Sequence, residues 1–363
     1  MKKALILGIS PVQTEAIETL QEMGIEVHAI ARDSIGPGKD VADVFQEIDF
    51  SDLDLVMDYM TKQNIDIIYS VGSDIAMPIA TSVSETLYLP HFVSSNTAII
   101  CNKKDKMRRL TKGIEGHIPF QVVKDLEFTL EIDYPVFIKP TDSQGQRGIT
   151  LVESEETLHE AVTHAINNSK NQKAIIEKYI GGYEVSINGY VIDGDIKFLI
   201  VSDRETWKSH EGLIHKHILD FNQDVRKEKI RRVISAHLEA LDLDNGPFYA
   251  QIKIEDDEAY MIEITPRLDG CHMHKVINHA TGVDLLKATF NHLVYSETPT
   301  FKCEKRDNII LEFQCHVPNE TIDYSQFEEN LEALEYYKYY QDGDTVKPVN
   351  GVFEKVGYHI YRK

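Results

Sequence analysis

A strand, a lysine, a glycine-bearing loop and a second strand follow one another from residue 134 to residue 152, and this order constrains the fold most. The apolar run Val136–Ile138 and the β-branched run Ile149–Val152 predict two short strands joined by a polar turn. Lys139 ends the first strand, and the glycines of the turn let backbone N–H groups approach a phosphate chain. Because the lysine precedes the loop and no helix follows, the pattern is not a Walker P-loop. It indicates another kind of nucleotide site, with an ordinary hairpin and a solvated lysine as the open alternative.

Length and charge limit what the chain binds. Its 363 residues suit two or three lobes, and 38 Lys and Arg against 59 Asp and Glu give a net charge of −21, which disfavours nucleic acid as a partner. The four cysteines are widely spaced and predict neither a disulfide framework nor a zinc knuckle. The apolar run at the start stops by Pro11, too early for a signal or a membrane span. We therefore expect a cytoplasmic protein that does not bind membranes.

The first hundred residues predict a small doubly wound α/β domain. Lys3–Leu7 and Ile25–Ala31 are expected as strands around a helix at Val12–Met23, and the pattern repeats with a helix at Leu53–Gln63 and a strand at Ile65–Val71. These alternating elements are typical of a parallel sheet with helices on its faces.

Two turns of this domain could bind a ligand or serve the fold alone. Gly8 and Ser10 lack a complete dinucleotide-binding motif, so a packing turn is the preferred interpretation. Asp74 follows a strand at the edge where open α/β sheets bind ligands, but a cap on the next helix is slightly favoured.

Charged residues then gather in two places. Five lysines and arginines lie between Asn102 and Leu110 and predict a basic helix, either a phosphate-binding element or a solvated face. Further on, two strands flank a Gly181–Gly182 turn, and they carry Glu177 and Glu184. Carboxylates in this arrangement can accept hydrogen bonds from an aminopurine or a ribose, although a solvent-facing hairpin is the alternative.

Oxygen ligands converge in a second predicted strand pair, Phe248–Ile254 with Ala259–Thr265. Glu263 and Thr265 share one face by the period of two, and Gln251 lies on the neighbouring strand. Such a face supports Mg²⁺ held by protein oxygens and substrate phosphates.

Taken together and in this order, three stretches resemble the ATP-grasp superfamily, closest in style to the carbamoyl-phosphate synthetase large subunit. They are the hairpin of residues 134–152, Glu-Lys-Tyr-Ile-Gly-Gly-Tyr-Glu at 177–184, and Ile-Glu-Ile-Thr-Pro-Arg-Leu-Asp-Gly at 262–270. The resemblance covers nearly the whole chain. It implies an α/β and α+β fold: a small N-terminal domain at 1–100, a first ATP-grasp lobe at 101–175 and a second lobe at 176–363.

The resemblance also implies which residues hold ATP. Lys139 and Lys106 would contact the phosphates under a loop at 142–148; Lys106 is chosen over Lys103 and Lys104 because the family carries an Asp-Lys dipeptide, here at 105–106. The implied loop contacts are Ser143, Gln144, Gly145 and Gly148. The implied adenine residues are Glu177, Lys178, Tyr179 and Ile180, and Glu184 is implied to hold the ribose.

For catalysis, the resemblance implies a metal site and a positively charged clamp. Gln251, Glu263 and Thr265 match metal-ligand positions for Mg²⁺ or Mn²⁺, and Arg267 matches the arginine that steadies the transferred phosphoryl group and the acyl intermediate. Arg267 and Lys139 are the catalytic candidates. Thr265 stands where many members carry Asn, so we expect an altered second metal site and keep an inactive nucleotide-binding protein as an alternative.

Histidines invite a zinc interpretation in one further region. The stretch 201–222 and the segment 271–274 are rich in them, yet no spacing resembles a complete structural zinc site. Two interpretations stay open: polar loop and cap positions, or the lining of an acceptor-substrate pocket. The candidate residues are Arg204, Trp207, His210, His215, His217, Asp269 and Cys271–His274.

The expected function follows from these assignments. We expect an enzyme that uses ATP to activate a small carboxylic acid as an acyl phosphate and couples it to an amine such as an amino acid. A small-molecule kinase, a carbamoyl-phosphate-type synthase and a non-catalytic regulatory protein are the alternatives. The sequence leaves the oligomeric state open, with a homodimer as one option. The tail is expected to complete the second lobe, with a tyrosine-rich helix around Leu331–Tyr340.

Overall fold

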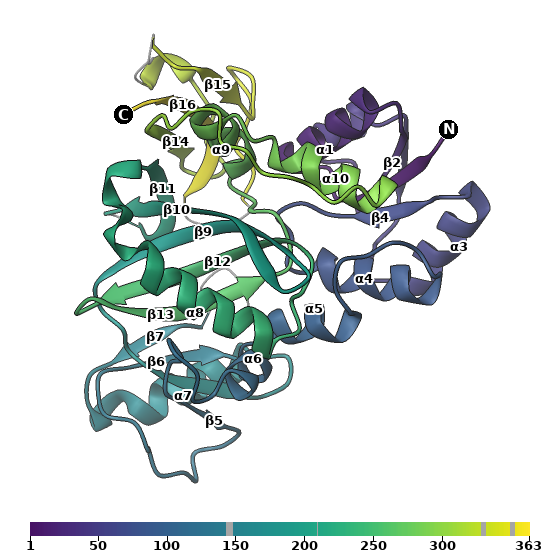
Figure 1. Cartoon of the computed structure of the whole chain (residues 1–363). Helices are drawn as coiled ribbons and strands as arrows, with labels where there is room; N and C mark the ends of the chain where they lie inside the picture. The colour runs from purple at the N-terminus through teal and green to yellow at the C-terminus, as the bar shows by residue number, and fades with distance from the viewer. Residues whose placement is uncertain (143–147, 209, 328–331, 349–352) are drawn as a thin grey trace.

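Three β-sheets organise the chain (Figure 1). The structure is a computed structural model, and it describes residues 1–142, 148–208, 210–327, 332–348 and 353–363. The mixture of a parallel sheet, two antiparallel sheets and covering helices confirms the expected α/β and α+β fold class.

The first sheet is parallel and has the strand order β3-β2-β1-β4. Its buried strands are covered by amphipathic helices, as the sequence predicts. The elements are β1 (Lys3–Leu7), α1 (Pro11–Glu22), β2 (Glu26–Ala31), α2 (Gly38–Val41), β3 (Val44–Glu47), α3 (Leu53–Gln63), β4 (Ile67–Tyr69) and α4 (Ala76–Thr86). Helices α5 (Ser95–Cys101) and α6 (Lys104–Leu110) then lead to the second sheet.

The second sheet is antiparallel, has the order β5-β8-β6-β7, and is covered by α7 through apolar side chains spaced three and four residues apart. The expected hairpin is present, with Ile138 of β6 opposite Thr150 of β7. The elements are β5 (Phe120–Val123), β6 (Val136–Pro140), β7 (Thr150–Val152), a 3₁₀ turn (Glu155–Thr157), α7 (Leu158–Asn167) and β8 (Ala174–Lys178). Because β8 pairs within this sheet, the expected lobe boundary at 175 falls inside a strand, and we propose to place it after Lys178.

The third sheet has eight antiparallel strands in the order β13-β12-β9-β10-β11-β14-β16-β15. Helix α8 lies across β9, β12 and β13 (Figure 1), and their alternate apolar residues pack against it. The elements are β9 (Tyr183–Ile192), β10 (Asp195–Trp207), β11 (His210–Leu219), α8 (Lys227–Ala240), β12 (Gly246–Glu255), β13 (Glu258–Thr265), α9 (Met273–Thr281), α10 (Leu285–Tyr295), β14 (Ile309–His316), β15 (Glu335–Lys338) and β16 (Glu354–Arg362), with 3₁₀ turns at Phe221–Arg226 and Tyr324–Gln326.

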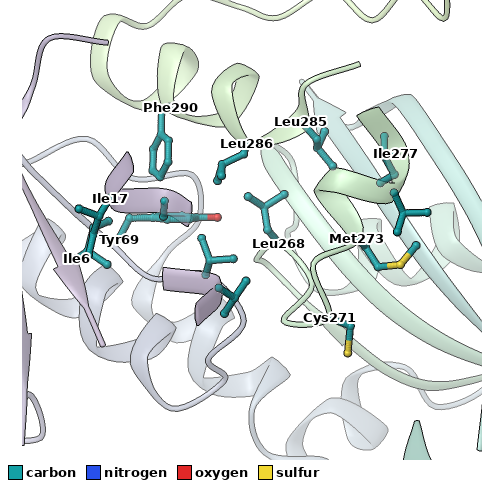
Figure 2. Packing of buried hydrophobic residues seen from close by; sticks show 14 of the residues in the cluster. Ile6, Ile17, Tyr69, Leu268, Cys271, Met273, Ile277, Leu285, Leu286 and Phe290 are labelled. Atoms are coloured by element: carbon teal, nitrogen blue, oxygen red, sulfur yellow. The ribbon is translucent and has the colours of Figure 1, made fainter. Parts of the chain in front are cut away.

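The loop after β13 is packed against the first sheet. Figure 2 shows Leu268 of this loop among side chains of the first sheet, α1, α9 and α10. The Gly72 N–H donates to the Leu268 carbonyl at 3.2 Å, and a Cβ on Gly72 would come within 2.5 Å of the Gly270 Cα. Gly72 also has φ +71, so a glycine is needed here both for conformation and for the close approach. This contact fixes the loop that carries Arg267.

One expectation about secondary structure is wrong. The described part of the expected helix around Leu331–Tyr340 contains no helix but the strand β15, because Glu335–Lys338 pairs with β16 and its tyrosines suit a pleated surface. Residue 331 itself lies outside the described residues. Of the two interpretations left open for 201–222, the polar loop does not fit, because most of its described residues lie in β10 and β11. Among the described helices, none combines the length and apolar character needed to span a membrane.

Candidate active site

A row of polar side chains crosses one face of the third sheet. Ser186 of β9 lies opposite Gln251 of β12 and opposite Ser202 of β10, and Gln251 lies opposite Glu263 of β13. The alternate residues of these strands point to the other face, where α8 covers them. The polar row therefore faces away from α8, as the sequence parity of Gln251 and Glu263 predicts.

The expected metal ligands come together at one end of this row. Gln251 and Glu263 are a cross-strand pair, and Thr265 lies two pairs further along, opposite Tyr249. Burial and the nearby Asp74 raise the pKa of Glu263, because both disfavour an additional negative charge. Thr265 is buried, and its Oγ1 has no hydrogen-bond partner among the described residues.

These observations fit a divalent cation. The surrounding cations do not fully offset the negative charge of ionised Glu263, so a metal ion would stabilise it. The Gln251 Nε2 donates to the Tyr249 hydroxyl at 2.7 Å, which leaves the amide oxygen of Gln251 to act as a metal ligand. Within the described ranges, no group of three or more His, Cys, Asp and Glu side chains is placed to hold a metal ion. The donor set thus suits Mg²⁺ whose remaining ligands come from substrate phosphates. The zinc alternative gains no support.

Lys139 belongs to a buried ion triad. The Glu177 carboxylate accepts from the Lys139 Nζ at 2.6 Å and from the Arg108 Nε at 2.6 Å. Burial alone would raise the pKa of Glu177, but the two cations outweigh it and lower that pKa to about 2. Arg108 also donates to the Ile262 carbonyl at 2.9 Å, beside Glu263. Arg108 therefore connects β8 of the second sheet to β13 of the third sheet, the strand that carries Glu263.

Lys104 lies among the same charges, at the start of α6. Burial lowers its pKa, and Glu263 and Lys139 are among the charges that act on it. Lys106 is exposed on the same helix. The structure thus favours Lys104 over Lys106 as the phosphate contact on α6, and we propose Lys104 for this role.

The residues expected around adenine form the crossing between the second and third sheets. The Tyr179 N–H donates to the Pro135 carbonyl at 3.0 Å, and the Tyr179 ring lies 5.0 Å from that of Phe137. Lys178 donates to backbone carbonyls before β6, and Ile180 is buried and accepts from Lys253 at 3.1 Å. Glu177 is held inward by the ion triad instead of lining this crossing as a free side chain.

The other residues expected to bind the nucleotide lie partly inside and partly outside the described ranges. Glu184 pairs with Arg204 on the neighbouring strand. Gly148 has φ +72, and a Cβ there would meet Pro140 and Asn168 at 2.8 Å. The expected loop contacts Ser143, Gln144 and Gly145 lie outside the described residues.

Arg267 is held by a residue from the first sheet. Its Nε and Nη2 both lie 2.6 Å from the Asp74 Oδ1, and its Nη1 donates to the Leu268 carbonyl at 3.0 Å. Burial alone would lower the pKa of Arg267, but the neighbouring Asp74 carboxylate outweighs the effect of burial and raises that pKa. The preference for Asp74 as a helix cap is wrong, because Ser73 accepts from the N–H of Ala76 instead.

The site contains three residues to which the sequence alone does not assign their place: Lys104, Arg108 and Asp74. Lys104 and Arg108 are four apart and therefore share one face of α6, a spacing that could have singled them out from the five cations. Asp74 had been recognised as standing at a ligand-binding edge, but no sequence signal linked it to Arg267, which lies 193 residues away.

Comparison with known proteins agrees with this geometry. Residues 132–275 match the ATP-grasp domain family. The chain contains an ATP-grasp domain. The match covers the hairpin, the Glu177–Glu184 stretch, Arg267 and the strands that carry Gln251 and Glu263.

Relatives and solved structures extend the similarity beyond the matched domain. The formate-dependent phosphoribosylglycinamide formyltransferase of Ignicoccus hospitalis is 28% identical over 192 residues, which cover 49% of this chain and 46% of that protein. The carbamoyl phosphate synthase large chain of Methanobrevibacter smithii is 23% identical over 316 residues, covering 79% of this chain and 30% of that protein. The chain thus spans less than half the length of these two relatives.

One solved structure shares its fold with the whole chain. The biotin carboxylase domain dimer of the 2-oxoglutarate carboxylase from Hydrogenobacter thermophilus, in complex with MgADP, has a TM-score of 0.81 at 17% identity, covering 100% of this chain and 86% of that chain. At this identity the likeness establishes the fold alone.

Proposed function

We propose that this protein is an ATP-dependent ligase that activates a small carboxylic acid as an acyl phosphate and couples it to an amine. The observation that carries the proposal is the gathering of cations around Glu263, the cross-strand partner of Gln251: Lys104 and Arg267 act on its carboxylate, and Lys139 acts in turn on Lys104. Cations beside a metal-ligand pair in an ATP-grasp domain suit phosphoryl transfer, which depends on positioning and electrostatics.

The first step transfers the γ-phosphoryl group of ATP to a carboxylate oxygen. A carboxylate repels nucleophiles by its charge, whereas the acyl phosphate formed with ADP has a good leaving group. Lys104 and Lys139 neutralise charge on the phosphates, and Arg267, held in place by Asp74, faces the charge of the transferred group. When bound, Mg²⁺ held by Gln251, Glu263 and Thr265 offsets phosphate charge.

The second step forms the C–N bond. The amine attacks the acyl carbon, inorganic phosphate leaves, and the nitrogen loses a proton to give an amide. Arg267 stabilises the departing phosphate, so one guanidinium serves both steps. The relative from Ignicoccus supports this class of reaction, because its name states dependence on formate, a carboxylic acid.

Four further points belong to the same proposal. We place the lobes at 1–100, 101–178 and 179–363, with the middle boundary moved as the pairing of β8 suggests. Mn²⁺ is proposed as a substitute for Mg²⁺, the cytoplasm as the compartment, and a homodimer as the assembly.

Release of ADP tests the function. Mg²⁺-ATP is incubated with pools of carboxylic acids, each with and without pools of amines, and Lys139→Ala is the blank. We expect release that requires both an acid and an amine and is lost in the variant. Release with an acid alone would favour a kinase, and ATP binding without any release would favour a regulatory protein.

A further inference from the structure

Buried polar atoms without a hydrogen-bond partner lie near the expected metal ligands Gln251 and Glu263, on β10, β11 and the loop after β13. Arg204 of β10 and His217 of β11 lie opposite each other, and Asp269 lies on the loop that carries Arg267. His217 is 0% exposed and Asp269 is 4% exposed. Among the described residues, no partner exists for the Arg204 Nε, the His217 Nε2 or the Asp269 Oδ2.

His217 connects these groups into one cluster, because Arg204 lies opposite it and Asp269 acts on it. Asp269 and Arg204 are among the charges that act on His217, and Lys355 is a third. Each group uses only part of its capacity: Arg204 pairs with Glu184 through Nη1, and the Asp269 Oδ1 accepts from the Cys271 N–H at 2.9 Å. Lys355 is engaged with the Cys271 Sγ at 3.5 Å.

Unpartnered buried polar groups are costly, so their concentration beside a reaction site calls for a ligand that completes them. The cluster offers an N–H donor on a cation, an imidazole nitrogen and an acceptor on an anion. A ligand with only negative groups would be repelled by the Asp269 carboxylate, and a ligand with only positive groups would be repelled by Arg204 and Lys355.

We propose that Arg204, His217 and Asp269 bind an α-amino acid as a zwitterion, with its carboxylate on Arg204 and His217 and its ammonium group on Asp269. This assignment rests on the proposed ligase function. Because the Arg204 guanidinium also acts on Glu263, the carboxylate of the bound amino acid lies toward the expected metal ligands. The amino acid is therefore the acid that is activated: its carboxylate oxygen attacks the γ-phosphorus of ATP, and ADP departs.

The test compares acids that differ only at the α-position. Alanine is compared with lactate, phenylalanine with phenyllactate, and glutamate with 2-hydroxyglutarate. Hydroxylamine serves as the amine, since it displaces phosphate from an acyl phosphate to give a hydroxamate, which is measured by its coloured complex with Fe³⁺ whatever the natural amine is. The readout is the ratio of kcat/KM for each amino acid to that for its hydroxy acid.

For at least one pair, we expect the wild-type protein to prefer the amino acid by roughly 10- to 100-fold, the range of a hydrogen bond between charged groups. Asp269→Asn keeps the acceptor for the Cys271 N–H but removes the charge, so it should bring this ratio close to one. Asp195→Asn, an exposed carboxyl at the far end of β10, should leave it unchanged.

Two outcomes would overturn the assignment. Equal use of hydroxy acids and amino acids by the wild-type protein, or an unchanged ratio in Asp269→Asn, would remove the amino-acid site but keep the ligase. Absence of hydroxamate and ADP with every acid would remove both the site and the proposed function.

Discussion

The Asp74 carboxylate, in a turn of the first sheet, holds the Arg267 guanidinium, on the loop after β13, with both Nε and Nη2 2.6 Å from one oxygen. The ion pair links the parallel sheet to the strand that carries Glu263. The N-terminal domain thereby contributes to the proposed reaction site, because Asp74 sets where the positive charge of Arg267 lies.

Asp74→Ala should therefore impair both stability and catalysis. It leaves the buried Arg267 without its main anion, and breaking such a pair from one side costs about 3 kcal/mol. Urea unfolding measures the free energy, and ADP release measures turnover. Asp58→Ala, which removes an exposed carboxyl of α3, should change stability by less than about 0.5 kcal/mol. Equal stability of the two variants would show that the Arg267 pair contributes nothing.

Much of this arrangement is predictable because it is local. The β12–β13 hairpin has a period of two, so the sequence places Gln251, Glu263 and Thr265 on one face, and the structure agrees. The hairpin with Lys139 is recognisable for the same reason, since strand, turn and strand lie within twenty residues. Contacts of this kind need no knowledge of the tertiary fold.

The remainder depends on orientation and long-range packing. Lys104 and Lys106 stand about 200° apart around a helix of 3.6 residues per turn, so an Asp-Lys dipeptide cannot decide which one faces the site. The partner of Arg267 lies in the turn after β4, and the packing of the loop after β13 against that turn, including the approach of Gly72 to Gly270, brings them together. The tyrosines of β15 form a strand because β16 lies beside them.

The two lysines of α6 can be separated directly. Lys104→Ala should lower kcat/KM for ATP by roughly 100-fold, the effect of removing one charged donor from developing negative charge. Lys106→Ala, two residues away and exposed, is the matched control and should stay within about twofold of the wild-type value. A larger loss in Lys106→Ala than in Lys104→Ala would restore the original choice.

The Glu177 triad predicts a stability change in acid. Because the pKa of Glu177 falls from 4.5 to about 2 on folding, the unfolded chain binds the proton first, and stability is lost as the pH falls from about 4.5 to about 2. The contribution is about 3 kcal/mol. In Glu177→Gln this contribution should be missing, so its free energy of unfolding should lie below that of wild type at pH 6 and approach it near pH 2.

Urea unfolding at a series of pH values measures this difference. Glu160→Gln, which replaces an exposed carboxyl on α7, should follow the wild-type curve throughout. A Glu177→Gln curve parallel to that of wild type would mean that the triad does not lower the pKa of Glu177.

Glu263 predicts how the requirement for Mg²⁺ changes with pH. Burial and Asp74 raise the pKa of Glu263, and only its ionised form is a good ligand, so a proton competes with the metal below that raised pKa. The half-saturating Mg²⁺ concentration should rise by up to about tenfold per pH unit in that range. Glu263→Gln should need more Mg²⁺ at every pH and should lose this pH dependence, whereas the exposed Glu239→Gln should keep it. Titration of ADP release with Mg²⁺ at fixed ATP, corrected for the protonation of ATP itself, gives these values. If the three proteins respond to pH alike, the metal is not held by Glu263.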